Sequence, residues 1–338
     1  MVARSDIRRR LAIVTGAFGA LLILMCLLAP LAGSTTISLV RAFDRSLPFA
    51  DNVDAQILFI ARLPRVLAAA LVGASLAAAG VTFQALLRNP LAAPETLGVS
   101  MGASVGAMIA ITAMPARLVG GMSAVPLAAF AGSVAALGVV YVLSIARSRG
   151  MSTTVLLLGG VVLTTFLGAV ISFVQYLSDY TQTARMVRWL MGSLDVGSYE
   201  PIGLALIPMA IAAGGYATLP RTLDLLSLGA ESAASRGVDV VRSERIALVS
   251  ASLSTGAAVS LAGPIGFIGI VVPHMVRLLV GADHRVVLPG AALFGASFLI
   301  GCDVIARRAF APLELPVGIV TAIIGGPFFL WLILRRAR

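Results

Sequence analysis

The sequence predicts an all-α, polytopic membrane protein with about ten transmembrane helices. Three observations lead to this fold class: 59% of the residues are apolar, 12% are charged, and nine long stretches contain no Asp, Glu, Lys or Arg. A soluble domain carries roughly 25% charged and about 45–50% apolar residues. Because a soluble fold cannot hide this much apolar surface, lipid must be the solvent for much of it.

Each charge-free stretch predicts at least one span, since about 20 helical residues cross a hydrocarbon core of roughly 30 Å. The seventh stretch is too long for one span, and the sequence GPIG at 263–266 together with Pro273 interrupts it. We expect one helix that ends at Ala262 and a second that runs through Pro273 to Gly281, which brings the total to ten. The stretches cover 11–40, 66–87, 96–116, 118–146, 150–178, 201–220, 246–276, 286–302 and 315–334.

Arginine indicates the orientation, because basic residues collect on the cytoplasmic side of membrane proteins. With the N-terminus inside and ten alternating spans, 16 of the 25 arginines fall inside and 9 fall outside. The opposite topology would invert this bias. We therefore expect both termini in the cytoplasm of a multi-pass membrane protein, folded as a single transmembrane domain over 1–338.

The first apolar stretch also resembles a signal peptide. Arg8, Arg9 and Arg10 precede it, and small residues follow at 31–34. The apolar part exceeds the usual length of about 7–15 residues, and its removal would leave an odd number of spans. We favour an uncleaved first helix.

One long polar segment lies on the cytoplasmic side, at 221–245. It holds four acidic and four basic residues, and its apolar positions fall near helical spacing. Gly229 and Gly237 are placed as helix ends. Two short helices at the membrane face fit this pattern. They would serve either as a solvated connector or as a docking surface for a cytoplasmic partner.

The residues of metal and catalytic chemistry are sparse. Cys26 and Cys302 are far apart in apolar runs, so neither a disulfide framework nor a metal site is expected. His274 stands in an apolar span without a second histidine nearby, which favours a structural role over a metal or haem ligand. No Walker A pattern and no nucleophile–base pair occurs. We expect no enzyme activity, no metal, no cofactor and no nucleic acid bound by this chain.

Eight segments, in order along the chain, carry a family resemblance. The chain resembles the permease subunits of type II ABC importers for iron-siderophores, haem and vitamin B12. The segments are 62–65 (RLPR), 84–94 (QALLRNPLAAP) with 97–103 (LGVSMGA), 188–193 (RWLMGS), Leu228 and Gly229 with Gly237, 263–269 (GPIGFIG), 273–277 (PHMVR), 303–307 (DVIAR) and 314–321 (ELPVGIVT).

The resemblance implies an assembly. Two permease subunits, expected as a homodimer, would surround a translocation path in the lipid bilayer. Two cytoplasmic ATPase subunits would use ATP, and a periplasmic binding protein would deliver the cargo for passage to the cytoplasm. The cargo would be a ferric siderophore, haem or cobalamin, with siderophores first because they are the commonest in the family.

The resemblance also assigns roles to residues. Arg62, Arg65 and Arg307 are expected at the outer mouth, where they would dock carboxylates of the binding protein rather than anchor helix ends at headgroups. From their position at the inner end of the second span, Gln84, Arg88 and Asn89 are expected either to line the path or close its inner gate, or merely to cap helices. The ATPase-coupling helix would comprise Leu228, Gly229, Ala230, Glu231, Ser232, Ala233, Arg236 and Gly237.

Two acidic residues near span ends bear on the alternative function, an ion-coupled secondary transporter. Such a protein needs carboxylates near mid-membrane and broken helices that supply ion-binding carbonyls. The break at 263–269 could serve such a site, but no acidic residue lies inside the charge-free stretches. We expect Asp303 and Glu314 to form local ion pairs with Arg307 or Arg308 instead of a proton relay.

Overall fold

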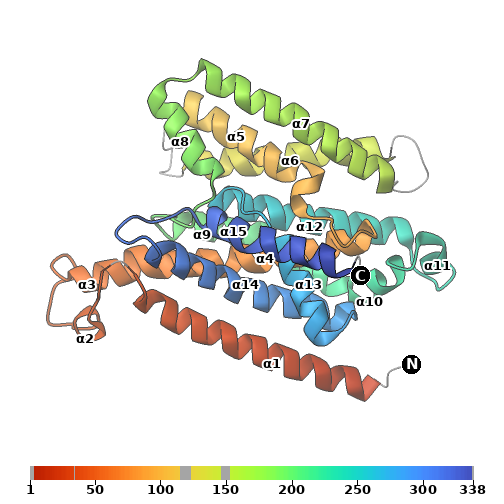
Figure 1. Ribbon diagram of the computed structural model, residues 1–338, viewed down its shortest axis with the longest axis horizontal. Helices are drawn as coiled ribbons and strands as arrows, with labels where there is room; N and C mark the ends of the chain where they lie inside the picture. Colours follow the sequence, from red (N-terminus) through yellow and green to blue (C-terminus); the bar gives the residue numbers. More distant parts are fainter. Residues whose placement is uncertain (1–3, 34, 115–122, 146–152, 337–338) are drawn as a thin grey trace.

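The computed structural model describes residues 4–33, 35–114, 123–145 and 153–336. Within these ranges the chain is helical and contains no β-strand. Figure 1 shows a bundle of long, roughly parallel helices in layers. A group formed by α5, α6, α7 and α8 lies on one side, and α1 covers the opposite side.

Ten apolar helices account for the predicted spans in the described parts of the chain. Seven are long and apolar enough to cross a membrane, and three more are shorter apolar helices. The long ones contain α1 (Arg4–Leu28), α4 (Leu63–Leu86), α6 (Ala124–Ile145), α7 (Thr153–Leu177), α9 (Glu200–Thr218), α12 (Val240–Ala262) and α14 (His284–Arg308). The others are α5 (Val99–Ala113), α13 (Ile268–Val280) and α15 (Val317–Arg336).

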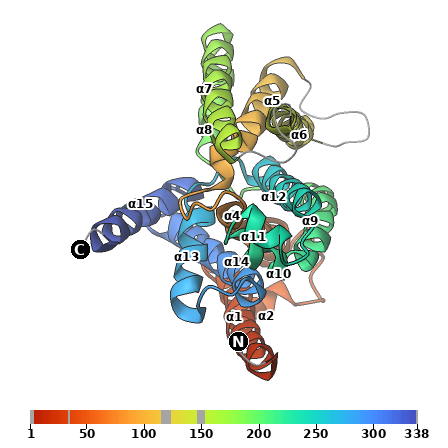
Figure 2. The same cartoon turned by 90° about the vertical axis from the view of Figure 1, so that its right-hand side faces the viewer.

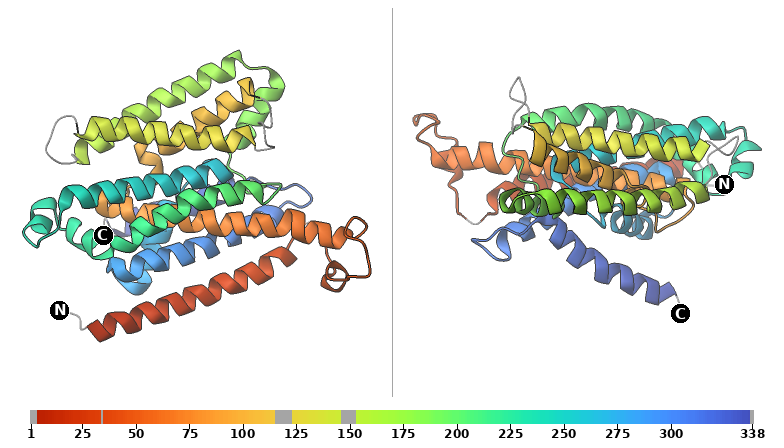
Figure 3. Two further views of the ribbon diagram at one scale, coloured as in Figure 1. Left: turned by 180° about the vertical axis from the view of Figure 1, so that it is seen from behind. Right: turned by 90° about the horizontal axis from the view of Figure 1, so that it is seen from above.

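Short elements occupy the ends of the bundle. At one end lie η1 (Ala29–Leu31), α2 (Leu39–Ala42), α3 (Val53–Gln56), the π-helical η2 (Ile57–Arg62) and α8 (Tyr180–Leu190). At the other lie α10 (Pro220–Leu226) and α11 (Ala230–Ala234), and η3 (Pro94–Leu97) connects α4 to α5. Both chain ends also lie at this second end (Figures 1 and 3). We call it the inner end and the first the outer end, following the predicted orientation.

The predicted break in the seventh charge-free stretch is confirmed. Helix α12 ends at Ala262, Gly263 follows with φ 69°, and α13 begins at Ile268 and ends before Gly281. A left-handed residue ends a helix, and glycine adopts this conformation without steric cost. The backbone N–H of Ser193 donates to the Ala262 carbonyl oxygen (2.8 Å), so a segment from the outer end completes the interrupted helix.

Helix α4 is the axis of the bundle. Figure 2 shows it near the centre of the end-on view, and it packs against α14, α12 and α13. Its crossings depend on small residues: a Cβ atom on Gly73 would collide with the Gly295 carbonyl oxygen of α14, and one on Gly80 with that of Gly269 in α13. Such close backbone contact is how helices associate in lipid, where no hydrophobic force drives them together.

Gly80→Ala should therefore destabilise the fold, because the added methyl group meets a backbone carbonyl that cannot move aside. Overpacking of this kind costs about 1–3 kcal/mol. Gly138→Ala in α6 is the matched control, since a Cβ there meets nothing within 4 Å. Thermal unfolding in one detergent should show a lower melting temperature for Gly80→Ala alone. Equal melting temperatures for the two variants would contradict the close crossing.

Candidate functional site

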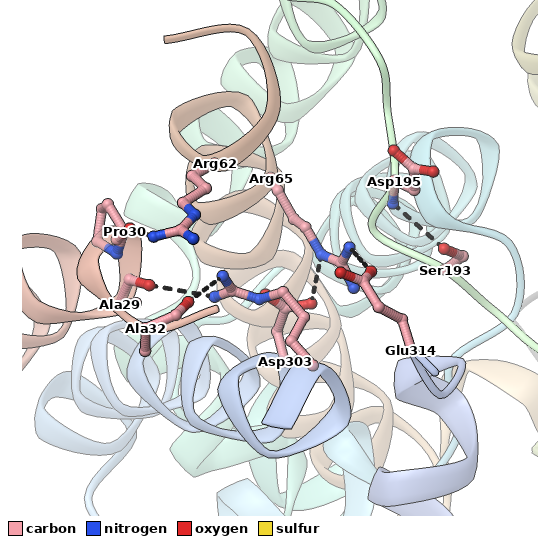
Figure 4. A network of polar contacts seen from close by, with 10 residues as sticks. Ala29, Pro30, Ala32, Arg62, Arg65, Ser193, Asp195, Asp303 and Glu314 are labelled. Carbon is pink, nitrogen blue, oxygen red and sulfur yellow. Dashed lines mark hydrogen bonds and ion pairs between the residues drawn. The ribbon is translucent and has the colours of Figure 1, made fainter. Parts of the chain in front are cut away.

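Three arginines and two carboxylates form a cluster at the outer end, which we call the outer arginine cluster: Arg62, Arg65, Asp303, Arg307 and Glu314 (Figure 4). Asp303 of α14 is fully buried, and each of its two carboxylate oxygens accepts a hydrogen bond from a different guanidinium group. Arg65 Nε donates to Asp303 Oδ1 (2.8 Å), and Arg307 Nε donates to Asp303 Oδ2 (2.9 Å). Arg65 Nη1 also donates to Glu314 Oε2.

The remaining donors of the cluster bind the end of the first span. Arg62 donates to the carbonyl oxygens of Pro30 and Thr35, and Arg307 donates to those of Ala29 and Ala32. Carbonyl groups at the C-terminal end of a helix lack partners within that helix, and cations are favourable there. The cluster thus ties the end of α1 to α4 and α14.

The three arginines lie at the outer end as predicted, but they are buried. Arg62, Arg65 and Arg307 are each less than 10% exposed, because internal carbonyls and carboxylates accept from their guanidinium groups. They do not extend freely toward headgroups. The expected pair of Asp303 with Arg307 is confirmed, whereas Glu314 pairs with Arg65 rather than with Arg307 or Arg308.

The sequence did not reveal an outer cavity of about 570 Å³ beside α8. Its lining includes Arg185, Arg188 and Trp189 of α8, with Asp195 and Glu200 from the following loop and α9. Helix α8 is amphipathic and begins with a capping box between Asp179 and Gln182. The polar residues between the fifth and sixth charge-free stretches, which include the RWLMGS segment, are the signal in the sequence that points to this region.

The segment 221–245 forms the two short helices that were expected at the inner end, α10 and α11. Gly229 separates them with φ 114°, a conformation that side chains rarely adopt. Leu223 of α10 and Ala233 of α11 are buried, while Leu228 between the helices is 64% exposed. Glu231, Arg236 and Gly237 are also exposed, and Arg236 donates to the Ser232 hydroxyl (2.6 Å). The segment therefore presents an apolar side chain beside charged groups at the inner surface.

Two hydrogen-bonding contacts of one carboxylate join α10 to the start of α14. Asp224 Oδ1 accepts from the backbone N–H of His284 (2.9 Å) and lies 2.6 Å from its Nδ1. Asp283, the residue before His284, accepts a hydrogen bond from the Arg285 guanidinium (2.6 Å). This hydrogen bond holds the pKa of the Asp283 carboxyl below its usual value. The contact between Asp224 and His284 therefore joins the 221–245 segment to the ninth span.

The predicted path residues Gln84, Arg88 and Asn89 lie together at the inner end of α4. Gln84 Nε2 donates to the Gly269 carbonyl (3.1 Å), and its Oε1 accepts from Arg277 of α13. The Asn89 side chain accepts from the backbone N–H of Leu91 (2.9 Å), so it caps the turn that follows α4. The three residues line one inner cavity, and their role in gating stays a prediction.

No group of three or more His, Cys, Asp or Glu residues that could hold a metal ion occurs in the described ranges. His274 packs its ring edge-on against Phe328, with centroids 6.4 Å apart. Cys26 and Cys302 are both free thiols. The expectation that the chain binds no cofactor stays a prediction.

Comparison with known proteins identifies the family. The model of the FecCD transport family matches residues 21–335. The chain belongs to the FecCD transport family. Its relatives include the cobalamin import system permease protein of Halobacterium salinarum, 44% identical over 88% of this chain and 79% of that one. The hemin transport system permease protein of Yersinia pestis is 41% identical over 94% of this chain and 95% of that one.

A solved structure shares the fold over nearly the whole chain. It is described as an inward-facing conformation of a metal-chelate type ABC transporter, and it superimposes with a TM-score of 0.79 at 30% sequence identity. The match covers 95% of this chain and 98% of that one. Together with the apolar helices, the FecCD relatives place the chain in the inner membrane as a multi-pass protein.

Asp303→Asn should strongly destabilise the protein, because it leaves two buried guanidinium groups without their shared carboxylate. Removing one partner of a buried ion pair costs about 3–5 kcal/mol. Glu314→Gln is the control: its side chain is 44% exposed, so the loss should stay below about 1 kcal/mol. Chemical unfolding of the two variants measures the difference. Similar losses would show that Asp303 does not hold the cluster together.

Asp224→Ala should loosen α10, because the helix loses its contact with His284. Backbone amide hydrogen exchange over 220–226 should become about tenfold faster, as expected for the loss of one hydrogen bond to a charged group. Ser227→Ala is the control, since its hydroxyl bonds only the nearby Asp224 carbonyl. Unchanged exchange in Asp224→Ala would mean that other contacts hold α10.

Proposed function

We propose that the chain is the membrane-spanning permease subunit of an ATP-driven importer that carries a bulky metal chelate from the periplasm to the cytoplasm. The supporting observation is the FecCD match over residues 21–335, together with a backbone like that of a metal-chelate type ABC transporter. The sequence has no Walker A pattern. ATP hydrolysis is therefore assigned to a separate ATPase subunit.

We assign the cargo to cobalamin or haem ahead of a ferric siderophore. Relatives that are 41–44% identical are named for cobalamin, vitamin B12 and hemin. These molecules share a metal held in a tetrapyrrole-type macrocycle. This order replaces the expectation from the resemblance alone, which put ferric siderophores first.

The proposed assembly contains two copies of this chain, two ATPase subunits at the inner end and a binding protein at the outer end. Leu228 lies between the two short helices and Glu231 lies on the second, and both side chains are exposed. Such an exposed pair is suited to docking into a cleft of an ATPase. The tie between Asp224 and His284 would transmit the ATPase's closure to the ninth span as a rigid-body movement. Coupling is therefore assigned to the segment 221–245.

Docking of the binding protein through Arg62, Arg65 and Arg307 remains our proposal, with one added condition. These arginines already have partners inside the protein. An incoming carboxylate of the binding protein must therefore replace one of these internal partners. Glu314 is the replaceable partner, since it is partly exposed and contacts only the rim of the outer arginine cluster at Arg65. Carboxylate exchange would then bring Arg65 to the binding protein without uncovering Asp303.

The ion-coupled secondary transporter is the weaker alternative. It requires a carboxylate within the membrane that can take up an ion or a proton. Asp303 is a fully buried carboxylate in a span, and both of its oxygens already accept from arginine. It is therefore poorly suited to a proton relay.

Reconstitution tests the function and the cargo together. The chain would be placed in proteoliposomes with its ATPase subunit and binding protein, and uptake of labelled cobalamin, haemin and a ferric siderophore would be compared. We expect ATP-dependent uptake of cobalamin or haemin. Uptake driven by an ion gradient without ATP would overturn the importer assignment, and uptake of the siderophore alone would overturn the cargo.

Glu231→Arg should uncouple the transporter, because charge reversal on α11 disturbs the proposed ATPase contact without touching the buried bundle. We expect at least a tenfold loss of cargo-stimulated ATP hydrolysis, with unchanged melting temperature of the permease. Asp6→Arg is the matched control, an exposed carboxylate on α1 near the same end. Wild-type stimulation in Glu231→Arg would remove this residue from the coupling contact.

A further inference from the structure

A cavity of about 430 Å³ opens at the inner end of the bundle. It lies where α4 and α13 end, beside the connection from α10 to α11 and the turn before α14. Its size falls within the range of small-molecule pockets, roughly 300–1,000 Å³. Its polar lining includes Gln84, Arg88, Asn89, Arg277 and His284.

The lining of this inner cavity is strongly one-sided in charge. It contains two arginines and two histidines but no Asp or Glu. Within the described ranges, neither Arg88 nor Arg277 has a carboxylate partner, and Arg277 donates only to the neutral amide oxygen of Gln84. The outer arginine cluster contrasts with it, because there Asp303 and Glu314 compensate the buried guanidinium charge.

His284 supplies a second indication of a missing ligand. The residue is 6% exposed, and its Nδ1 faces Asp224. Its Nε2 is buried and has no hydrogen-bond partner among the described residues. A buried polar atom is normally satisfied by protein, water or a ligand. The His284 ring at the cavity wall thus has one nitrogen bound by the protein and one left for a ligand.

We propose that the inner cavity binds a phosphate group, carried either by an anionic lipid headgroup or by a soluble phosphate compound. Guanidinium groups are suited to phosphate oxygens, and amide and imidazole N–H groups complete such sites. In the predicted orientation the cavity would lie at the depth of the inner headgroups, because α13 ends and α14 begins beside it. Basic pockets between spans on this side typically take lipid phosphates. This inference does not depend on the transported cargo.

A bound phosphate would add a further connection between the end of α4 and the segment 221–245. Arg88 lies two residues after the end of α4, and its guanidinium lies 3.8 Å from the position that a Cβ atom on Gly229 would occupy. His284 is tied to α10 through Asp224. A phosphate held by Arg88 and His284 would therefore link the axis helix to the segment 221–245.

The test measures melting of the full-length chain in detergent with added ligand. One arm adds inorganic phosphate, a second adds a short-chain phosphatidylglycerol, and a third adds phosphatidylcholine, all at matched ionic strength. Ligand that binds only the folded state raises the melting temperature in proportion to its affinity. We expect a rise with phosphatidylglycerol, with inorganic phosphate, or with both, and none with phosphatidylcholine. A rise with the lipid alone identifies a headgroup, and a rise with both identifies a general phosphate site.

Arg88→Gln is the decisive variant. Arg88 is exposed, so its replacement leaves no cavity in the packed core. It should weaken the affinity about tenfold, the loss expected for one charge-assisted hydrogen bond. Arg242→Gln is the control, an exposed arginine at the inner end of α12 that does not line the cavity. No stabilisation by either phosphate ligand would overturn the proposal, and so would equal stabilisation of the wild type and Arg88→Gln.

Discussion

Helix α4 leaves no room for a side chain where it crosses α14 and α13. Gly73 and Gly80 bring its backbone against the carbonyl groups of Gly295 and Gly269, so its position and rotation are set by steric contact. Its outer end consequently delivers Arg65 to Asp303 on α14. Its inner end delivers Gln84 to Gly269 and Arg277 on α13. The outer arginine cluster and the polar contacts of Gln84 at the inner end therefore both depend on the close packing of α4.

The two ends differ in how they treat buried charge. At the outer end, Asp303 lies between Arg65 and Arg307, and the surplus donors reach carbonyl groups that follow α1. The arginines therefore hold the end of α1, α4 and α14 together. At the inner end, Arg88 and Arg277 lack carboxylates in the described ranges, so their charge remains available. Unmet charge at the inner surface is the feature expected of a binding site, whereas paired charge chiefly sets geometry.

Much of the candidate site could be located from the sequence, but not its contacts. The short helices around Gly229 were predictable because glycine and helical spacing act locally. The pairing of Arg65 with Glu314 was not, because 249 positions separate the two residues. The same holds for Asp224 and His284, which are 60 positions apart. Arg62, Arg65 and Arg307 were predicted to share one end of the bundle, yet their burial depended on partners at the end of the first span and on α14.

The sequence by itself determined that the chain lies in a membrane, how many apolar helices it has, and where the long charge-free stretch breaks at Gly263. These properties follow from transfer of apolar residues into lipid and from local backbone conformation, which act over a few turns of helix. Only the tertiary structure decided which helix is central and which charges are compensated. Those outcomes depend on steric fit and ion pairing between residues that the chain order keeps far apart.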